Sequence, residues 1–354
     1  MSDNKKRMNF IRKSRMTLPL SLCHMGIDFL CAFSLYRLFA DRYEAFLLYN
    51  FCAFALQMPL GIAIDIISSR SNKSIMPGMS FMIGGVIFTI IGSFVSNIIL
   101  GIGNALFHVG GGVLVIHEDD DNDLKGRALG CFVAPGAIGL ILGILYSDTS
   151  MFNVIRIGIS LILCLIGFWI YKNSNEKELL IRHKKFSTER KELLYIILLC
   201  FMVVIIRSLT GMAISFPWKH SNLVTIISVI AVALGKMIGG FLSAELGMKK
   251  TVIITLCISA LAYLFGNNLY AGLIALLFFN MTMPITLYLL AINMSDMPGF
   301  AFGILTFGLF LGYLPVHYGY LNDLSPSFGA IASLISLFIL YLTIRLSSGD
   351  EDHG

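Results

Sequence analysis

The feature that most constrains this chain is an apolar run that holds a histidine and an aspartate. The run, LPLSLCHMGIDFLCAFSLYRL, covers residues 18–38, and a helix of about 20 such residues crosses a bilayer. His24 and Asp28 lie in its middle, four residues apart, so they share one face of a helix. Charged groups at that depth cost about 2.5 kcal/mol or more and usually face a protein interior or a water-filled path. We therefore expect the remaining helices to form a shell around this pair.

Similar apolar runs recur along the whole chain. Of its 354 residues, 56% are hydrophobic and only 13% are charged, whereas soluble domains carry about 25% charged residues. The pattern predicts an all-α polytopic membrane protein with about 12 transmembrane helices, and the alternating segments of a β-barrel are not apparent. The predicted spans are 17–38, 43–64, 75–96, 98–117, 127–147, 152–172, 193–216, 222–244, 251–268, 270–292, 298–320 and 326–346.

Charge and cysteine content narrow the predicted partners. The net charge of +5 comes from basic residues in short loops between spans, so a lipid bilayer is predicted as a partner and nucleic acid is not. All seven cysteines lie inside apolar runs and no pair has C-x-x-C spacing, which favours small hydrophobic side chains over a disulfide framework or a metal site. We expect no cofactor, no metal and no catalytic residue.

Basic residues also predict the orientation. With the N-terminus inside, about 20 Lys and Arg residues fall in cytoplasmic segments and about four outside, the bias known as the positive-inside rule. Both termini are therefore predicted to be cytoplasmic, in a bacterial cytoplasmic membrane. The acidic segment 118–123 is expected to be a solvated cytoplasmic loop, and its role is left open.

The chain divides into two halves that repeat weakly. Similar stretches begin at Gly61 and Gly240, an offset of 179 in the numbering, and a glycine-rich series that begins at Gly126 recurs from Gly299, an offset of 173. The first offset relates Asp28 to Arg207, so these two charges are expected to face each other across the centre. The predicted divisions are a cytoplasmic tail (1–16), an N-terminal six-helix bundle (17–172), a cytoplasmic linker (173–192), a C-terminal six-helix bundle (193–346) and a second tail (347–354).

Several stretches resemble the major facilitator superfamily. Residues 61–70 (GIAIDIISSR) and 240–249 (GFLSAELGMK) are similar to its loop signature G-x-L-a-D-r-x-G-r-k, and ALGCFVAPGAIGLILG is similar to its glycine-proline motif. Within the superfamily, LSLCHMGIDF, GIGNALFH and MPGFAFG resemble fosmidomycin-resistance-type exporters. The F-H-P-E of those exporters is here Phe107-His108-Val109-Gly110.

The resemblance implies alternating access to a central cavity between two pseudo-symmetric halves. His24 and Asp28 are predicted to couple transport to protons. The substrate cavity is predicted to include Asn104, His108, Arg207, Lys236 and Asn280. The resemblance further implies a conformational gate formed by Gly61, Asp65, Arg70, Gly240 and Glu245.

These observations predict a proton-coupled secondary transporter that acts as a monomer and exports a small organic molecule. Two fixed mid-span cations against one acid also leave open the uptake of a small organic anion. Asp28 could instead belong to a permanent structural ion pair, and His24 could serve only to orient it. A membrane enzyme or a non-transporting receptor is the competing class, but the sequence offers no nucleophile, metal cluster or appended signalling domain.

Overall fold

The structure is a computed structural model that describes residues 14–40, 42–71, 74, 76–174 and 190–348. The described residues form helices joined by loops, with an isolated β-bridge between Ile214 and Leu324 and no longer strand among them, so the fold is all-α as predicted. The helices are α2 (Thr17–Phe39), α3 (Tyr43–Asn50), the π-helix η1 (Phe51–Ala55), α4 (Gln57–Arg70), α5 (Met76–Val95), α6 (Asn97–Asp121), α7 (Arg127–Val133), α8 (Pro135–Tyr146), α9 (Phe152–Asn173), α10 (Arg190–Ala213), α11 (Asn222–Leu246), α12 (Met248–Leu264), α13 (Leu269–Asn280), α14 (Thr282–Asn293), α15 (Pro298–His317) and α16 (Pro326–Ser347).

The helices confirm the predicted number of spans. Eleven continuous or nearly continuous helices are long and apolar enough to cross a membrane in the described part of the chain, and α12, with 17 residues, completes the series of twelve. Three spans are interrupted: η1 joins α3 to α4, α7 passes into α8 at Pro135, and α13 passes into α14 at Met281. Such breaks are tolerated at membrane depth only where protein surrounds the freed backbone groups.

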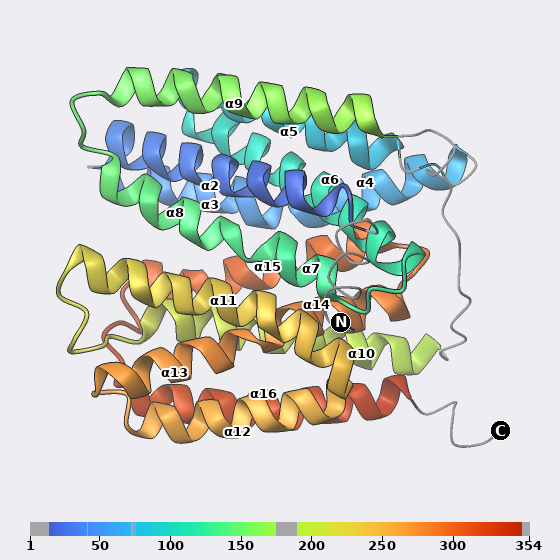
Figure 1. The fold of residues 1–354 in the computed structure, drawn as a ribbon, viewed down its shortest axis with the longest axis vertical. Coiled ribbons are helices and arrows are strands. Elements are labelled where there is room, and N and C mark those ends of the chain that lie inside the picture. The colour runs from blue at the N-terminus through green and yellow to red at the C-terminus, as the bar shows by residue number, and fades with distance from the viewer. Residues whose placement is uncertain (1–13, 41, 72–73, 75, 175–189, 349–354) are drawn as a thin grey trace, which may run out of the picture.

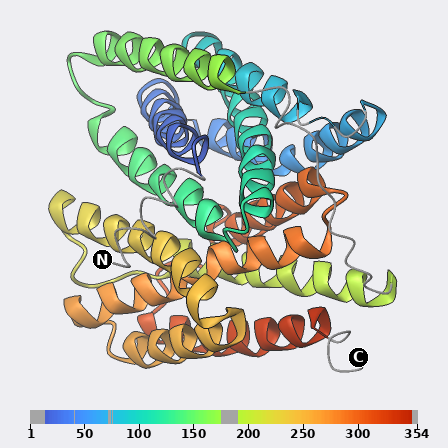
Figure 2. The same ribbon diagram turned by 45° about the vertical axis from the view of Figure 1, so that its right-hand side comes forward.

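The two halves form two layers (Figure 1). Helices α2 to α9 build one layer and α10 to α16 the other, and the separation persists in the view turned by 45° (Figure 2). Twelve spans place the start of α2 and the end of α16 on the same face, which we call the terminal face. The opposite side is the loop face.

Two reciprocal helix crossings join the layers near the terminal face. In the first, Gly61 of α4 lies against the backbone of Gly299 in α15 so closely that a Cβ on either would overlap it. In the second, Gly240 of α11 lies against the backbone of Gly126 at the start of α7. Glycines allow this approach because they carry no side chain. The glycine stretches that repeat in the sequence thus make equivalent contacts in the two halves.

The acidic segment 118–123 differs from the expected solvated loop. Residues 118–121 continue α6, and Glu118 accepts hydrogen bonds from the backbone N–H of Met16, at 2.8 Å, and from the hydroxyl of Thr17, at the start of α2. Asp119 is 1% exposed and accepts from the N–H groups of Gly126 and Leu129, at 2.7 and 3.0 Å. The prediction was wrong for Glu118 and Asp119 because helix N-termini leave unpaired N–H groups, and these two carboxylates satisfy them. Asp120, Asp121 and Asp123 are exposed, as expected.

At the loop face an aromatic contact joins the layers. The Tyr43 hydroxyl donates to the carbonyl oxygen of His317, and the two rings stack with centroids 3.9 Å apart. Phe51 of η1 meets Phe310 of α15 edge to face at 5.6 Å. The halves are therefore in contact on both sides of the bundle's middle.

Candidate functional site

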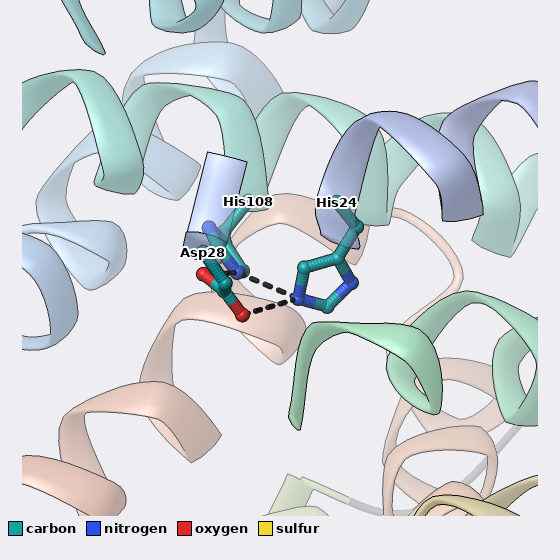
Figure 3. A group of neighbouring side chains, drawn as sticks. All are labelled: His24, Asp28 and His108. Carbon is teal, nitrogen blue, oxygen red and sulfur yellow. Dashed lines mark hydrogen bonds and ion pairs between the residues drawn. The ribbon is translucent and has the colours of Figure 1, made fainter. Parts of the chain in front are cut away.

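The first part of the site comes from α2, whose middle turn presents two ionisable side chains. His24 is 6% exposed and the side chain of Asp28 is 17% exposed. Their i, i+4 spacing brings His24 Nε2 within 3.2 Å of Asp28 Oδ2, as the sequence predicted (Figure 3).

The second part comes from α6, which packs beside α2. His108 Nε2 lies 2.8 Å from His24 Nε2 and 3.4 Å from Asp28 Oδ1. Asn104, one turn earlier, donates from its amide to Asp28 Oδ1 at 3.1 Å. We call His24, Asp28 and His108 the triad, and Figure 3 shows their polar atoms converging on one point.

The other nitrogen of each histidine determines where the ring protons lie. His24 Nδ1 is 2.7 Å from the carbonyl oxygen of Phe132, and His108 Nδ1 is 2.8 Å from that of Asn104. A carbonyl oxygen can only accept, so both Nδ1 atoms carry hydrogen and donate. If both rings are neutral, neither Nε2 atom carries hydrogen, and each presents a lone pair.

This hydrogen-bond pattern has a charge consequence. Two bare Nε2 atoms at 2.8 Å repel each other, and the Asp28 carboxylate adds a third acceptor rather than a donor. A hydrogen bond between the two nitrogens requires one additional proton. The triad is therefore built to hold a cation, with Asp28 as its counter-charge and Asn104 fixing the carboxylate.

Two buried phenylalanine rings pack against the His24 ring of the triad. The His24 ring lies 4.8 Å from that of Phe132 and 6.3 Å from that of Phe107, centroid to centroid. Both phenylalanines are fully buried. Exclusion of water by these rings strengthens the electrostatic interactions among the three polar groups.

The break between α7 and α8 supplies the partner of His24. Pro135 has no N–H and interrupts the helical ladder, and the carbonyls of Phe132 and Val133 just before it accept side-chain hydrogen bonds. Gly136 follows, and a Cβ at this position would overlap His24 Nε2 and Asp28 Oδ2. The proline-glycine step thus lets α8 lie directly against the triad.

The C-terminal half contributes two cations. Lys236 of α11 reaches across to the carbonyl oxygen of Val133 at 3.4 Å. Arg207 of α10 is 7% exposed and donates from Nη2 to the hydroxyls of Thr282 and Thr286, at 2.9 and 3.3 Å.

Arg207 and Asp28 do not share a hydrogen bond or ion pair among the described residues. Each has other partners: Asp28 has the two histidines and Asn104, while Arg207 has two threonines and a buried Nε that is left without an acceptor. Asn280 donates to the carbonyl of Leu276 within its own helix at 2.8 Å. The expected pairing of Asp28 with Arg207 is therefore absent from this conformation.

The residues of the predicted gate lie at the terminal face. Asp65 is 7% exposed and accepts from the N–H groups of Gly299 and Phe300, at 2.9 and 2.7 Å, which caps α15. Arg70 is exposed at the end of α4. Glu245, next to the position that the repeat relates to Asp65, accepts from Arg127 at 2.7 Å, so an acid at this end of the second half also links the two halves.

Three elements of the site are hard to find in the sequence. The Phe132 carbonyl carries no side-chain signal, and Pro135 indicates only that the helical hydrogen-bond ladder is interrupted nearby. Thr282 and Thr286 have i, i+4 spacing, which places both hydroxyls on one face of α14, but only the fold shows that Arg207 is opposite them.

This arrangement of twelve spans in two layers is the fold of major facilitator superfamily transporters. A variant of the fucose:proton symporter FucP of E. coli has a TM-score of 0.62 at 13% identity, covering 94% of this chain and 98% of that chain. FucP in the outward conformation gives a TM-score of 0.58 at 13% identity, covering 94% and 99%. The human organic anion transporter MFSD10 (TETRAN) gives 0.64 at 13% identity, covering 93% and 99%.

Sequence comparisons add nothing to this likeness. No protein-family model matches the chain, and no curated protein matches it. The three solved structures described above are transporters, and a likeness at 13% identity establishes the fold alone.

Proposed function

We propose that this protein is a proton-coupled secondary transporter that moves a small organic molecule across a bacterial cytoplasmic membrane by alternating access. The triad is the proton-carrying site. The observation that carries the proposal is the 2.8 Å contact of two Nε2 atoms whose Nδ1 atoms both donate to carbonyl oxygens. That contact needs an extra proton, and a proton held beside a carboxylate at membrane depth is what coupling requires.

The two halves supply the moving parts in this proposal. The first bundle (17–172) carries the triad, and the second (193–346) carries Arg207 and Lys236. Rocking of one bundle on the other changes the distance between Lys236 and Asp28, and the approach of a cation favours release of the triad's proton. Export follows the resemblance to fosmidomycin-resistance-type exporters, and the cytoplasmic placement of both termini follows the bias of basic residues. In this proposal the protein acts as a monomer.

The test is proton movement in proteoliposomes that enclose a pH-sensitive dye. Compounds chosen by thermal-shift screening at two pH values are added, and proton flux is recorded. Asp28→Asn keeps the shape of the side chain and removes its charge, so we expect it to abolish compound-driven proton flux. Asp148→Asn, at an exposed carboxylate that pairs with Arg37 at 3.4 Å, is the matched control. Undiminished flux in Asp28→Asn would remove the triad from the coupling mechanism.

Uptake of a small organic anion is the second candidate. It is favoured by Arg207, a buried guanidinium with no carboxylate partner in the described part of the chain and with Nε unpartnered. An anionic ligand would stabilise a buried cation that has no charged partner. Arg207→Gln should then weaken anion binding at least tenfold, and unchanged affinity would count against this candidate. Human MFSD10, similar in fold, is an organic anion transporter.

A further inference from the structure

The triad also has the composition of a transition-metal site, which the sequence did not predict. Two histidine nitrogens and one carboxylate oxygen lie within 4.8 Å of one another, from two different helices. All three are acceptors aimed at one point, as the hydrogen-bond pattern requires (Figure 3). Imidazole nitrogen with carboxylate oxygen is a ligand set that suits zinc, cobalt, nickel and ferrous iron.

The groups behind the three ligand atoms match those that support metal sites. A metal-binding histidine almost always donates its other N–H to a backbone carbonyl, a carboxylate or water, which fixes the tautomer and aims the free nitrogen. His24 and His108 both do so, at 2.7 and 2.8 Å. Ligating carboxylates are likewise hydrogen-bonded, and Asn104 holds Asp28 Oδ1 at 3.1 Å.

The distances show what must move when an ion binds. A tetrahedral ion with ligand bonds of about 2.0–2.1 Å separates its ligand atoms by about 3.3 Å. His24 Nε2 lies 3.2 Å from Oδ2 of Asp28 and His108 Nε2 lies 3.4 Å from Oδ1, so each nitrogen is near a different oxygen of the carboxylate. Ligation through a single oxygen therefore requires the carboxylate to turn, whereas an ion held by both oxygens needs less movement. The two nitrogens, at 2.8 Å, must separate by about 0.5 Å, and loss of the proton between them removes the hydrogen bond that holds them close.

We propose that the triad binds a divalent late first-row transition-metal ion through His24 Nε2, His108 Nε2 and the carboxylate of Asp28. The ion and the bridging proton occupy the same place, so one proton leaves to solvent as one ion enters, and no electron is transferred. The fourth position is open to water or to a carboxylate of the organic substrate, whose charge Lys236 and Arg207 would balance. Only the exchange of ion for proton during transport rests on the proposed function.

The chemistry also predicts selectivity. Magnesium and calcium require oxygen ligands, and the triad offers a single carboxylate with two nitrogens. Zinc and cobalt bind this set readily. The site should therefore bind Zn²⁺ and Co²⁺ and leave Mg²⁺ and Ca²⁺ unbound at equal concentration.

Binding is tested on the purified full-length protein with Co²⁺ and Zn²⁺ alone. Co²⁺ in a low-symmetry nitrogen–oxygen site absorbs visible light, and calorimetry with Zn²⁺ gives affinity and stoichiometry. We expect one ion per chain. His24→Gln and Asp28→Asn should each weaken binding by more than the roughly 10–100-fold that loss of an outer partner costs, and Asn104→Leu should fall within that range.

His220→Gln, at an exposed histidine outside the triad, is the matched control and should change nothing. All variants keep the seven cysteines, so metal bound by thiols is the same in each and subtracts out. Gel filtration and a melting curve without metal show whether a variant is folded, and Asp28→Asn, nearly identical in shape, decides the matter if a histidine variant is not. Equal affinity in wild type and Asp28→Asn would overturn the proposal.

Transport separates the two proposals. If wild type binds no metal while Asp28→Asn still abolishes compound-driven proton flux, the metal inference fails and the proposed function stands. If the triad binds Co²⁺ while that proton flux is indifferent to Asp28→Asn, the metal site stands and the coupling proposal fails. An inward Zn²⁺ gradient that drives protons out of wild-type proteoliposomes, and not out of Asp28→Asn ones, is the result expected when both hold.

Discussion

Asp65 should control whether the terminal face is open or closed, and Asp65→Asn tests this directly. The carboxylate of α4 reaches the other half of the protein and accepts from two N–H groups at the start of α15, at 2.9 and 2.7 Å. These contacts exist only while α4 and α15 are packed together. Weakening them should therefore favour the state in which this face is open.

The magnitude follows from the two hydrogen bonds. Each charge-assisted bond contributes about 1.5–3 kcal/mol, against about 0.5–1.5 kcal/mol for a neutral one. The negative charge at a helix N-terminus adds about 0.3–1 kcal/mol. An asparagine retains one neutral acceptor, so the substitution removes about 3 kcal/mol from the closed state. At about 1.4 kcal/mol per factor of ten, the closed-to-open ratio should fall about 100-fold.

The assay is pulsed electron paramagnetic resonance in a background whose seven cysteines are replaced. Spin labels at Ser69, exposed near the end of α4, and Met297, exposed just before α15, report the separation of the two helices. We expect one short distance in the parent protein and a second, longer distance in Asp65→Asn. Glu44→Gln, an exposed acid at the loop face, is the control. Identical distance distributions for Asp65→Asn and the parent would refute the reasoning.

Three further substitutions test other contacts. Gly61→Ala places a methyl group on the backbone of Gly299, so it should lower the melting temperature or drive the terminal face open; an unchanged melt and unchanged label distances would contradict the packing. Asp119→Ala strips the caps from the N–H groups of Gly126 and Leu129 and should cost about 2 kcal/mol or more, seen as earlier denaturation, whereas a loss below about 0.5 kcal/mol would argue against it. Gly136→Ala sets a methyl group against the triad and should abolish both proton-coupled flux and Co²⁺ binding, and retention of both would show that the site is more spacious than described.

The sequence was sufficient for the elements that depend on local patterns. Apolar runs of about 20 residues must cross a membrane as helices because their backbone groups have no other partners there. The i, i+4 spacing of His24 and Asp28 placed both on one face of α2, and the structure confirms their contact at 3.2 Å. The glycine offsets likewise predicted equivalent crossings, because two helix backbones can approach closely only where the residues between them are small.

Tertiary packing decided which residues of different helices come into contact. His108 lies 84 residues from His24 in the chain, and the carbonyl of Phe132 comes from a third helix, so the triad exists only once α2, α6 and α7 are packed. The acidic segment 118–123 illustrates the same limit, because a carboxylate's burial depends on which helix ends lie beside it. Spacing related Asp28 to Arg207 by the repeat, but equivalent positions in two halves need not touch. Hydrogen bonds form between atoms that packing brings within about 3 Å, and that distance is set by how the helices are arranged in space.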